Sequence, residues 1–214
     1  MAKSKKDPLG GFRGRIGNLV VYEMYGKPCV RSMPAKTSKK ASEKLKKEQE
    51  GFATVMHYLT PATKFIQMGF AEAAENTAPF HMAKSWNINN YRKSQTKDPS
   101  EWLQYSLGER AGSQGMQLKE VPGQLLEVSW VQPEEGKPCA ENDIVMLLAI
   151  NSKSKTASYR LHAAYRKDGQ AVIELPERRS GEAVEVFVAF RKLGAEQGKK
   201  DLKNVSNSQW VGRV

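Results

Sequence analysis

The sequence predicts an α+β protein, with a β-hairpin and a short helical segment in its first half and a β-sandwich at its C-terminal end. Three observations lead to this class. Short apolar runs with strand-like spacing recur from residue 116 to residue 214. Apolar positions between residues 38 and 90 recur at helical spacing, and a glycine-rich stretch at residues 10–34 precedes both. We expect the main core to lie in the C-terminal part.

The C-terminal stretch is predicted to hold about seven short strands. Residues 144–150 are apolar throughout, which is typical of a central strand covered on both faces. Trp130 is expected to anchor the core, and Lys167–Gly169 is typical of a hairpin turn. The strands are expected at residues 116–121, 124–131, 144–150, 157–165, 171–175, 184–190 and 205–211. This spacing favours an immunoglobulin- or fibronectin-like sandwich, a scaffold that by itself carries no function.

The N-terminal stretch begins with a basic arm, residues 1–9, which is followed by the glycine-rich residues 10–34. Strand-like runs at residues 19–25 and 29–33 flank a Gly-Lys turn, so the stretch is predicted to be a β-hairpin. A phosphate-binding loop is the alternative. The glycines at 11, 14 and 17 precede the first strand instead of linking a strand to a helix, and their spacing fits neither nucleotide-binding pattern.

This stretch also carries a resemblance. The run Gly-Gly-Phe-Arg-Gly-Arg-Ile-Gly-Asn-Leu-Val, the Gly-Lys turn and the ending Val-Arg-Ser-Met-Pro resemble the N-terminal signature of an uncharacterised Bacteroidota family. The similarity continues through residues 52–70 and into the tail at residues 205–208, so it spans most of the chain. The family has a domain of unknown function of about this length. The resemblance therefore supports the architecture and implies no activity.

The middle of the chain is predicted to be helical. Residues 38–58 are predicted to form a helix with an apolar stripe opposite a lysine-rich side. Shorter helices are expected at residues 62–74 and 78–90. The polar, turn-rich residues 93–115 are predicted to be a linker. The expected boundaries are a basic arm at 1–9, a hairpin at 10–34, a helical segment at 35–92, a linker at 93–115 and a sandwich at 116–214.

Charge is concentrated near the start of the chain. The net charge is +11, and residues 1–60 hold 13 Lys and Arg against 5 Asp and Glu, whereas residues 116–214 hold 15 against 13. Cys29 and Cys139 lie far apart, which favours a reducing compartment. No signal-peptide pattern and no membrane-spanning run is present. We expect a soluble protein, in the cytoplasm or within a particle assembled there.

The residues that could carry chemistry are scattered. His57, His81 and His162 have no neighbours at metal-ligand spacing. Ser94 and Lys97 match a Ser-x-x-Lys pattern by letter, but no partner motif of that catalytic class accompanies them. We therefore expect no enzymatic activity, no metal site and no cofactor.

Two functions remain after this exclusion. The first is a structural or interaction protein, a subunit of a larger assembly such as a virion or phage particle, which docks on protein partners or on copies of itself. The alternative is a nucleic-acid-binding protein that contacts phosphates through residues 1–47. We favour the first slightly, because the basic region is predicted to be partly folded and matches no nucleic-acid-binding module. The candidate contact residues of either function are Lys3, Lys5, Lys6, Arg13, Arg15, Lys27, Arg31, Lys36, Lys39 and Lys40.

Overall fold

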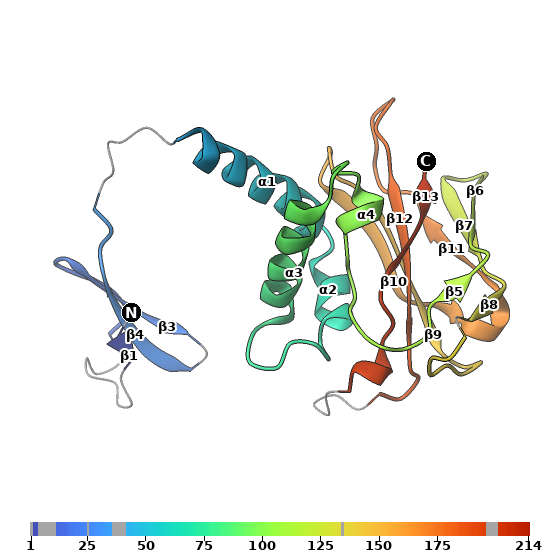
Figure 1. Cartoon of the computed structure of the whole chain (residues 1–214), viewed down its shortest axis with the longest axis horizontal. Coiled ribbons are helices and arrows are strands. Elements are labelled where there is room, and N and C mark those ends of the chain that lie inside the picture. Colours follow the sequence, from blue (N-terminus) through green and yellow to red (C-terminus); the bar gives the residue numbers. More distant parts are fainter. Residues whose placement is uncertain (1, 4–11, 25, 36–41, 134, 196–200) are drawn as a thin grey trace. The chain divides into compact units, whose positions relative to one another are not determined.

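A computed structural model describes residues 2–3, 12–24, 26–35, 42–133, 135–195 and 201–214 of the chain. The chain forms two compact units, Met1–Ser42 and Glu43–Val214, which we call the N-terminal unit and the body. Figure 1 shows their elements. The protein is α+β, with helices in the body and antiparallel sheets in both units. This confirms the fold class predicted from the sequence.

The N-terminal unit is a small antiparallel sheet with the strand order β1-β4-β3-β2. Its strands are β1 (Ala2–Lys3), β2 (Gly14–Ile16), β3 (Leu19–Met24) and β4 (Lys27–Ser32). Strands β3 and β4 form the predicted hairpin, with Leu19 opposite Ser32. The residues before this hairpin add the further strand β2, because Ile16 pairs with Leu19 across a two-residue turn. Gly17 in that turn has φ +55°, a left-handed conformation that favours glycine.

The body begins with the predicted helical segment. Its helices are α1 (Glu43–Leu59), α2 (Thr63–Gly69), α3 (Pro79–Lys93) and the short α4 (Pro99–Trp102). Helix α1 is described from Glu43, and the expected start near Ser38 lies outside the described residues. Helix α3 has a proline in its first turn, where the missing N–H has no intrahelical partner to lose. The Lys97 ammonium ends α3 by donating to the carbonyl oxygens of Tyr91 and Ser94.

Seven strands then form the predicted sandwich. One sheet has the order β10-β9-β12-β13, and the other has the order β11-β7-β6. The strands are β6 (Gln117–Val121), β7 (Leu125–Ser129), β9 (Ile144–Asn151), β10 (Thr156–Tyr165), β11 (Gln170–Glu174), β12 (Glu185–Arg191) and β13 (Gln209–Arg213), with the short pair β5 (Ser113–Gln114) and β8 (Gln132–Pro133) beside them. In the strand letters used for immunoglobulin folds, the smaller sheet holds strands A, B and E, which are β6, β7 and β11. The larger sheet holds strands C, F and G, which are β9, β12 and β13. The fourth strand of the larger sheet, β10, lies beside C.

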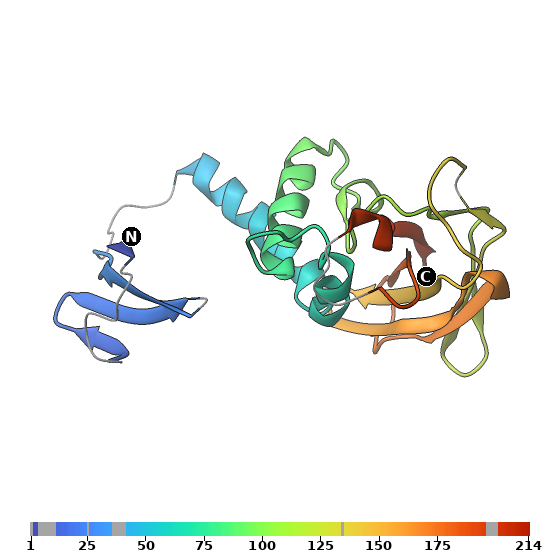
Figure 2. The ribbon, with the colours of Figure 1, turned by 90° about the horizontal axis from the view of Figure 1, so that it is seen from below.

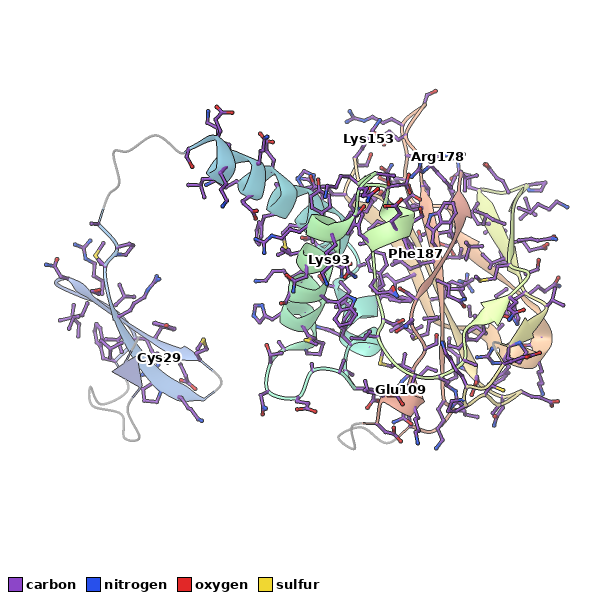
Figure 3. The ribbon with its side chains drawn as sticks, viewed as in Figure 1. Cys29, Lys93, Glu109, Lys153, Arg178 and Phe187 are labelled. Carbon is purple, nitrogen blue, oxygen red and sulfur yellow. The ribbon has the colours of Figure 1, made fainter. Side chains whose placement is uncertain are left out.

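The larger sheet lies between two apolar layers, with the helices on one side and the smaller sheet on the other (Figure 2). The side chains of strand β9 alternate between the two layers. Met146 and Leu148 pack in the cluster that includes the helices, whereas Val145 and Leu147 pack in the cluster that includes β7 and β11. Phe187 on β12 belongs to the helix-side cluster and lies inside the body (Figure 3). The apolar run at residues 144–150 is therefore a strand buried on both faces, as predicted.

The connection between the helices and the sandwich is packed into this core. Residues 93–115 were predicted to be a linker, but Trp102, Tyr105 and Ala111 within them are buried. The Tyr105 N–H donates to the hydroxyl of Ser208 at 2.8 Å. A polar, turn-rich composition shows no periodicity, so buried side chains at single positions leave no pattern that the sequence reveals.

The turn at Lys167–Gly169 does not close a hairpin. It forms a short 3-10 helix, η1 (Arg166–Asp168), and Gly169 follows with φ +69°. The strands on its two sides belong to different sheets, because β10 pairs with β9 and β11 pairs with β7. The local turn chemistry was interpreted correctly as a reversal. The predicted pairing of the two flanking strands was wrong, because pairing depends on the long-range packing of the two sheets. A second 3-10 helix, η2 (Leu202–Asn204), precedes β13.

Candidate functional site

The ten candidate contact residues are all the Lys and Arg residues of the N-terminal unit. Residues 1–42 hold 10 Lys and Arg against 2 Asp and Glu, whereas residues 43–214 hold 24 against 21. Most of the net positive charge thus belongs to the smaller unit. Five candidates lie outside the described residues: Lys5, Lys6, Lys36, Lys39 and Lys40. Lys3 is described only through its backbone, in β1.

The strand register gathers three of the other candidates on one face of the sheet. Arg15 on β2 and Arg31 on β4 are both cross-strand partners of Val20 on β3. Directly paired residues lie on the same face, so the two guanidinium groups flank Val20. Lys27 stands four residues before Arg31 on the same strand, and the period of two places it on that face as well. We call Arg15, Lys27 and Arg31 the cationic face.

An aromatic side chain belongs to the same face. Tyr22 is two residues after Val20 on β3, and the Arg31 guanidinium lies 5.8 Å from the centre of its ring. Arg15 donates through Nε to the carbonyl oxygen of Gly17 at 2.9 Å, which holds its side chain near the turn. The face therefore offers cations beside an aromatic ring, a combination suited to phosphates or carboxylates.

Arg13 differs from the other described candidates. Its guanidinium forms a 2.8 Å ion pair with Glu23 on β3. The carboxylate neutralises most of the attraction that Arg13 could exert on an anion. The candidate set from the sequence was thus uniform in charge, but the structure separates a paired arginine from the cationic face.

The opposite face of the sheet carries exposed apolar side chains beside the ion-paired Glu23. Ile16 and Leu19 are cross-strand partners on that face, and both side chains are exposed. Val21 is buried beside them. A sheet of this size covers little apolar surface by itself, so exposed aliphatic pairs on it favour contact with another surface.

Two groups of residues in the body carry chemistry that sequence reasoning missed. Asp143 is buried between Arg110 and Arg166, and it accepts hydrogen bonds from both guanidinium groups. Burial lowers the pKa of Arg166, although Asp143 opposes that shift. The three residues are far apart in the sequence, so no local signal connects them. Arg166 also donates to the carbonyl oxygens of Ala111 and Gly112, and the cluster thereby fastens the connection to the sandwich.

The second group is a pocket beside α3 that has exposed tryptophans in its wall. Among the described residues, no group of His, Cys, Asp and Glu could hold a metal ion. The helices in the described part of the chain include none that is both long and apolar enough to cross a membrane. The Ser94–Lys97 pattern has a structural explanation, because Lys97 supports the end of α3.

Fold and site together define an α+β protein in which an immunoglobulin-like sandwich, covered by helices on one face, follows a small cationic sheet. The chain belongs to the family described as "Family of unknown function (DUF6266)", which matches residues 11–212. The family assignment thus covers the cationic face and the body alike. No curated protein and no solved structure gives a significant match.

Proposed function

We propose that this protein is a non-enzymatic subunit of a larger assembly, which docks through its basic N-terminal unit on an acidic protein surface. The observation that carries the proposal is the register of the N-terminal sheet, which aligns Arg15, Lys27 and Arg31 on one face. The body is close to neutral, so the positive field that a partner meets comes mainly from this unit.

The apolar side of the same sheet supports a docking role. Phe12, Ile16 and Leu19 remain 43–46% exposed. Interfaces combine such apolar contacts with charged groups that orient the partner. A sheet with a cationic face and exposed aliphatic side chains on its other face can therefore bridge two surfaces at once.

The alternative is a nucleic-acid-binding protein that contacts phosphates through residues 1–47. The cationic face favours this function too, because Tyr22 lies beside the guanidinium of Arg31 and could stack on a base. Binding of this kind is mainly electrostatic, so its affinity falls steeply with salt. An assembly that also buries apolar surface keeps more of its affinity.

Three finer assignments belong to the proposal. They are a Bacteroidota origin, a location in the cytoplasm or in a particle assembled there, and a role as a virion or phage-particle component. The last rests on analogy, since basic segments attached to β-sandwiches suit subunits that bridge their neighbours. Electron microscopy of assembled material would test it, and regular particles are the expected result.

The test is light scattering behind size exclusion, at about 50 mM and 200 mM salt, with and without short duplex DNA and RNA. We expect an oligomer that persists at the higher salt and ignores nucleic acid. The variant Arg15→Glu/Arg31→Glu should dissociate it, because the reversed charges repel an acidic partner surface. The matched control, Lys64→Glu/Lys119→Glu, makes the same change in net charge on exposed positions of the body and should leave the oligomer intact.

Two results would change the conclusion. A monomer that shifts only with nucleic acid at low salt, and loses that shift in Arg15→Glu/Arg31→Glu, would establish the nucleic-acid alternative. Equal assembly and equal nucleic-acid binding by this variant and the unmodified chain would remove the cationic face from either function.

A further inference from the structure

The body contains a pocket of about 430 Å³ between α3, residues 100–104 and the start of β13. Three tryptophans line it. Trp102 is buried, whereas Trp86 on α3 and Trp210 on β13 have side chains that are 38% and 37% exposed. Large aromatic side chains are usually buried or paired in a protein of this size. Two half-exposed indoles in the wall of one pocket therefore favour a ligand that stacks on them.

Both indoles are held by elements that are fixed in the body. Trp210 is the cross-strand partner of Phe187, and its Nε1–H donates to Glu185 Oε2 at 2.7 Å. Trp86 precedes Asn87, whose buried side chain accepts from the Gln104 N–H at 2.7 Å and so fastens α3 to the extended residues beneath the pocket. The two rings thus border a preformed site, which lowers the ordering cost of binding.

Amide and carboxylate groups line the remaining wall. Asn90 donates through Nδ2 to the carbonyl oxygen of Trp102, but its Oδ1 accepts no hydrogen bond from the described residues. Gln104 donates one of its two Nε2 hydrogens to the carbonyl oxygen of Ser208. Glu101 accepts from the Ser94 hydroxyl through Oε2. Thr96 also hydrogen-bonds to Glu101, so the acceptor on Asn90 and a donor on Gln104 are the groups that remain for a ligand.

The charge of the lining limits the ligand class. The described residues around this pocket include the Glu101 carboxylate and no Lys or Arg, so a phosphate or carboxylate ligand would be repelled. A purely apolar ligand would leave the amides unpaired. A pyranose sugar satisfies both conditions, because its C–H face stacks on an indole and its equatorial hydroxyls donate and accept hydrogen bonds.

We propose that the pocket between Trp86 and Trp210 binds a neutral pyranose carbohydrate. The proposal uses residues of the body and does not depend on the function proposed for residues 1–42. A carbohydrate on an assembly partner or on a cell surface would then be a second contact of the protein.

The indole N–H signals in ¹H–¹⁵N NMR spectra of the full chain provide the test. The chain has four tryptophans. The buried Trp130 lies outside the pocket lining and serves as the internal control, whereas Trp102 lines the pocket. The probes are the methyl glycosides of glucose, galactose, mannose, xylose and N-acetylglucosamine, each added to about 50 mM because single-ring ligands bind weakly. We expect at least one glycoside to shift the Trp86 and Trp210 signals, assigned through Trp86→Phe and Trp210→Phe, while the Trp130 signal stays unchanged.

The variant Trp86→Ala should lower the affinity for that glycoside at least tenfold, read from the Trp210 signal, because the stacking surface is lost (about 1.4 kcal/mol). Phe52→Ala is the matched control, since it removes another exposed aromatic ring from a body helix and should bind the glycoside normally. No shift with any of the five glycosides would overturn the proposal. So would unchanged binding by Trp86→Ala, or a response to a proline-rich peptide or a nucleoside without one to the glycosides.

Discussion

The two units of this protein use their apolar residues in opposite ways. In the body, apolar side chains on both faces of the larger sheet are buried in two clusters. In the described part of the N-terminal unit, Val21 and Cys29 are the buried side chains of this kind, while Phe12 and Ile16 stay exposed. The body therefore gains its stability from burial within one unit. The small sheet is held mainly by its strand pairing, and its remaining apolar surface suits contact with a partner.

The largest expected effect tests this contrast with two phenylalanines. Phe187 is fully buried, and its ring centre lies 4.9 Å from that of Tyr105. Phe187→Ala should lower the free energy of unfolding of the body by about 3–5 kcal/mol, through lost burial and the cavity left behind. Phe12→Ala, in the N-terminal unit at a position that is 44% exposed, should change the free energy of unfolding of that unit by less than about 0.5 kcal/mol. Urea unfolding followed by circular dichroism measures both, and equal midpoints would show that the contrast is wrong.

Two glycines sharpen the comparison, because each is required for a different reason. A Cβ at Gly69 would lie 2.3 Å from the carbonyl oxygen of Tyr105, a backbone atom that cannot move aside. Gly69→Ala should therefore lower the free energy of unfolding of the body by about 1–3 kcal/mol. At Gly17 there is open space around the Cβ position, but φ is +55°. Gly17→Ala should cost the N-terminal sheet about 1–2 kcal/mol from its left-handed backbone alone.

Substitution by asparagine distinguishes the steric overlap at Gly69 from the left-handed backbone at Gly17. Gly17→Asn should recover much of the loss, because asparagine tolerates the left-handed conformation, whereas Gly69→Asn should not. Urea unfolding reports the Gly69 variants, and hydrogen exchange of the β3 amides reports the Gly17 variants. Recovery at Gly69, or none at Gly17, would contradict the assignment.

The smallest effect concerns a loop at one end of the sandwich. Hydrogen bonds from the Ser154 hydroxyl, and then from the Asn151 amide, lower the pKa of Glu182 to about 2 from its ordinary 4.5. A carboxyl whose pKa is depressed by folding stabilises the folded state above the ordinary pKa. That contribution should be lost as the pH falls from about 4.5 towards 2. The effect should stay small, because the carboxyl is only partly buried and water screens its charge.

The measurement is an NMR titration of the Glu182 carboxyl. Ser154→Ala removes the largest cause of the shift and should raise the pKa towards the ordinary value. Ser152→Ala, in the same loop, is the matched control and should leave it low. A Glu182 pKa that is the same in the unmodified chain and in Ser154→Ala would exclude this hydrogen bond as the cause.

The candidate site could be predicted in kind but not in detail. Counting charges along the chain was enough to concentrate the search on residues 1–47. The strand period of two also places Lys27 and Arg31 on one face once the strand is known. The ion pair between Arg13 and Glu23 joins different strands and could not be inferred from either residue's neighbours. The pocket at Trp86 and Trp210 was missed, because its walls come from opposite ends of the body sequence.

The sequence by itself determined where the three longer helices and most sandwich strands lie, although the last strand begins at Gln209 and not at residue 205 as expected. The apolar run at residues 144–150 predicted a doubly covered strand, and the spacing from residue 116 onward predicted an immunoglobulin-like sandwich. Only the tertiary structure decided which strands pair across Lys167–Gly169, that Trp102 and Tyr105 are core residues, and that Asp143 joins two arginines. The physical reason is that periodicity indicates which side chains of a segment face water and which face a core. Pairing, close packing and buried charge depend on residues far away in the chain, whose positions no local pattern contains.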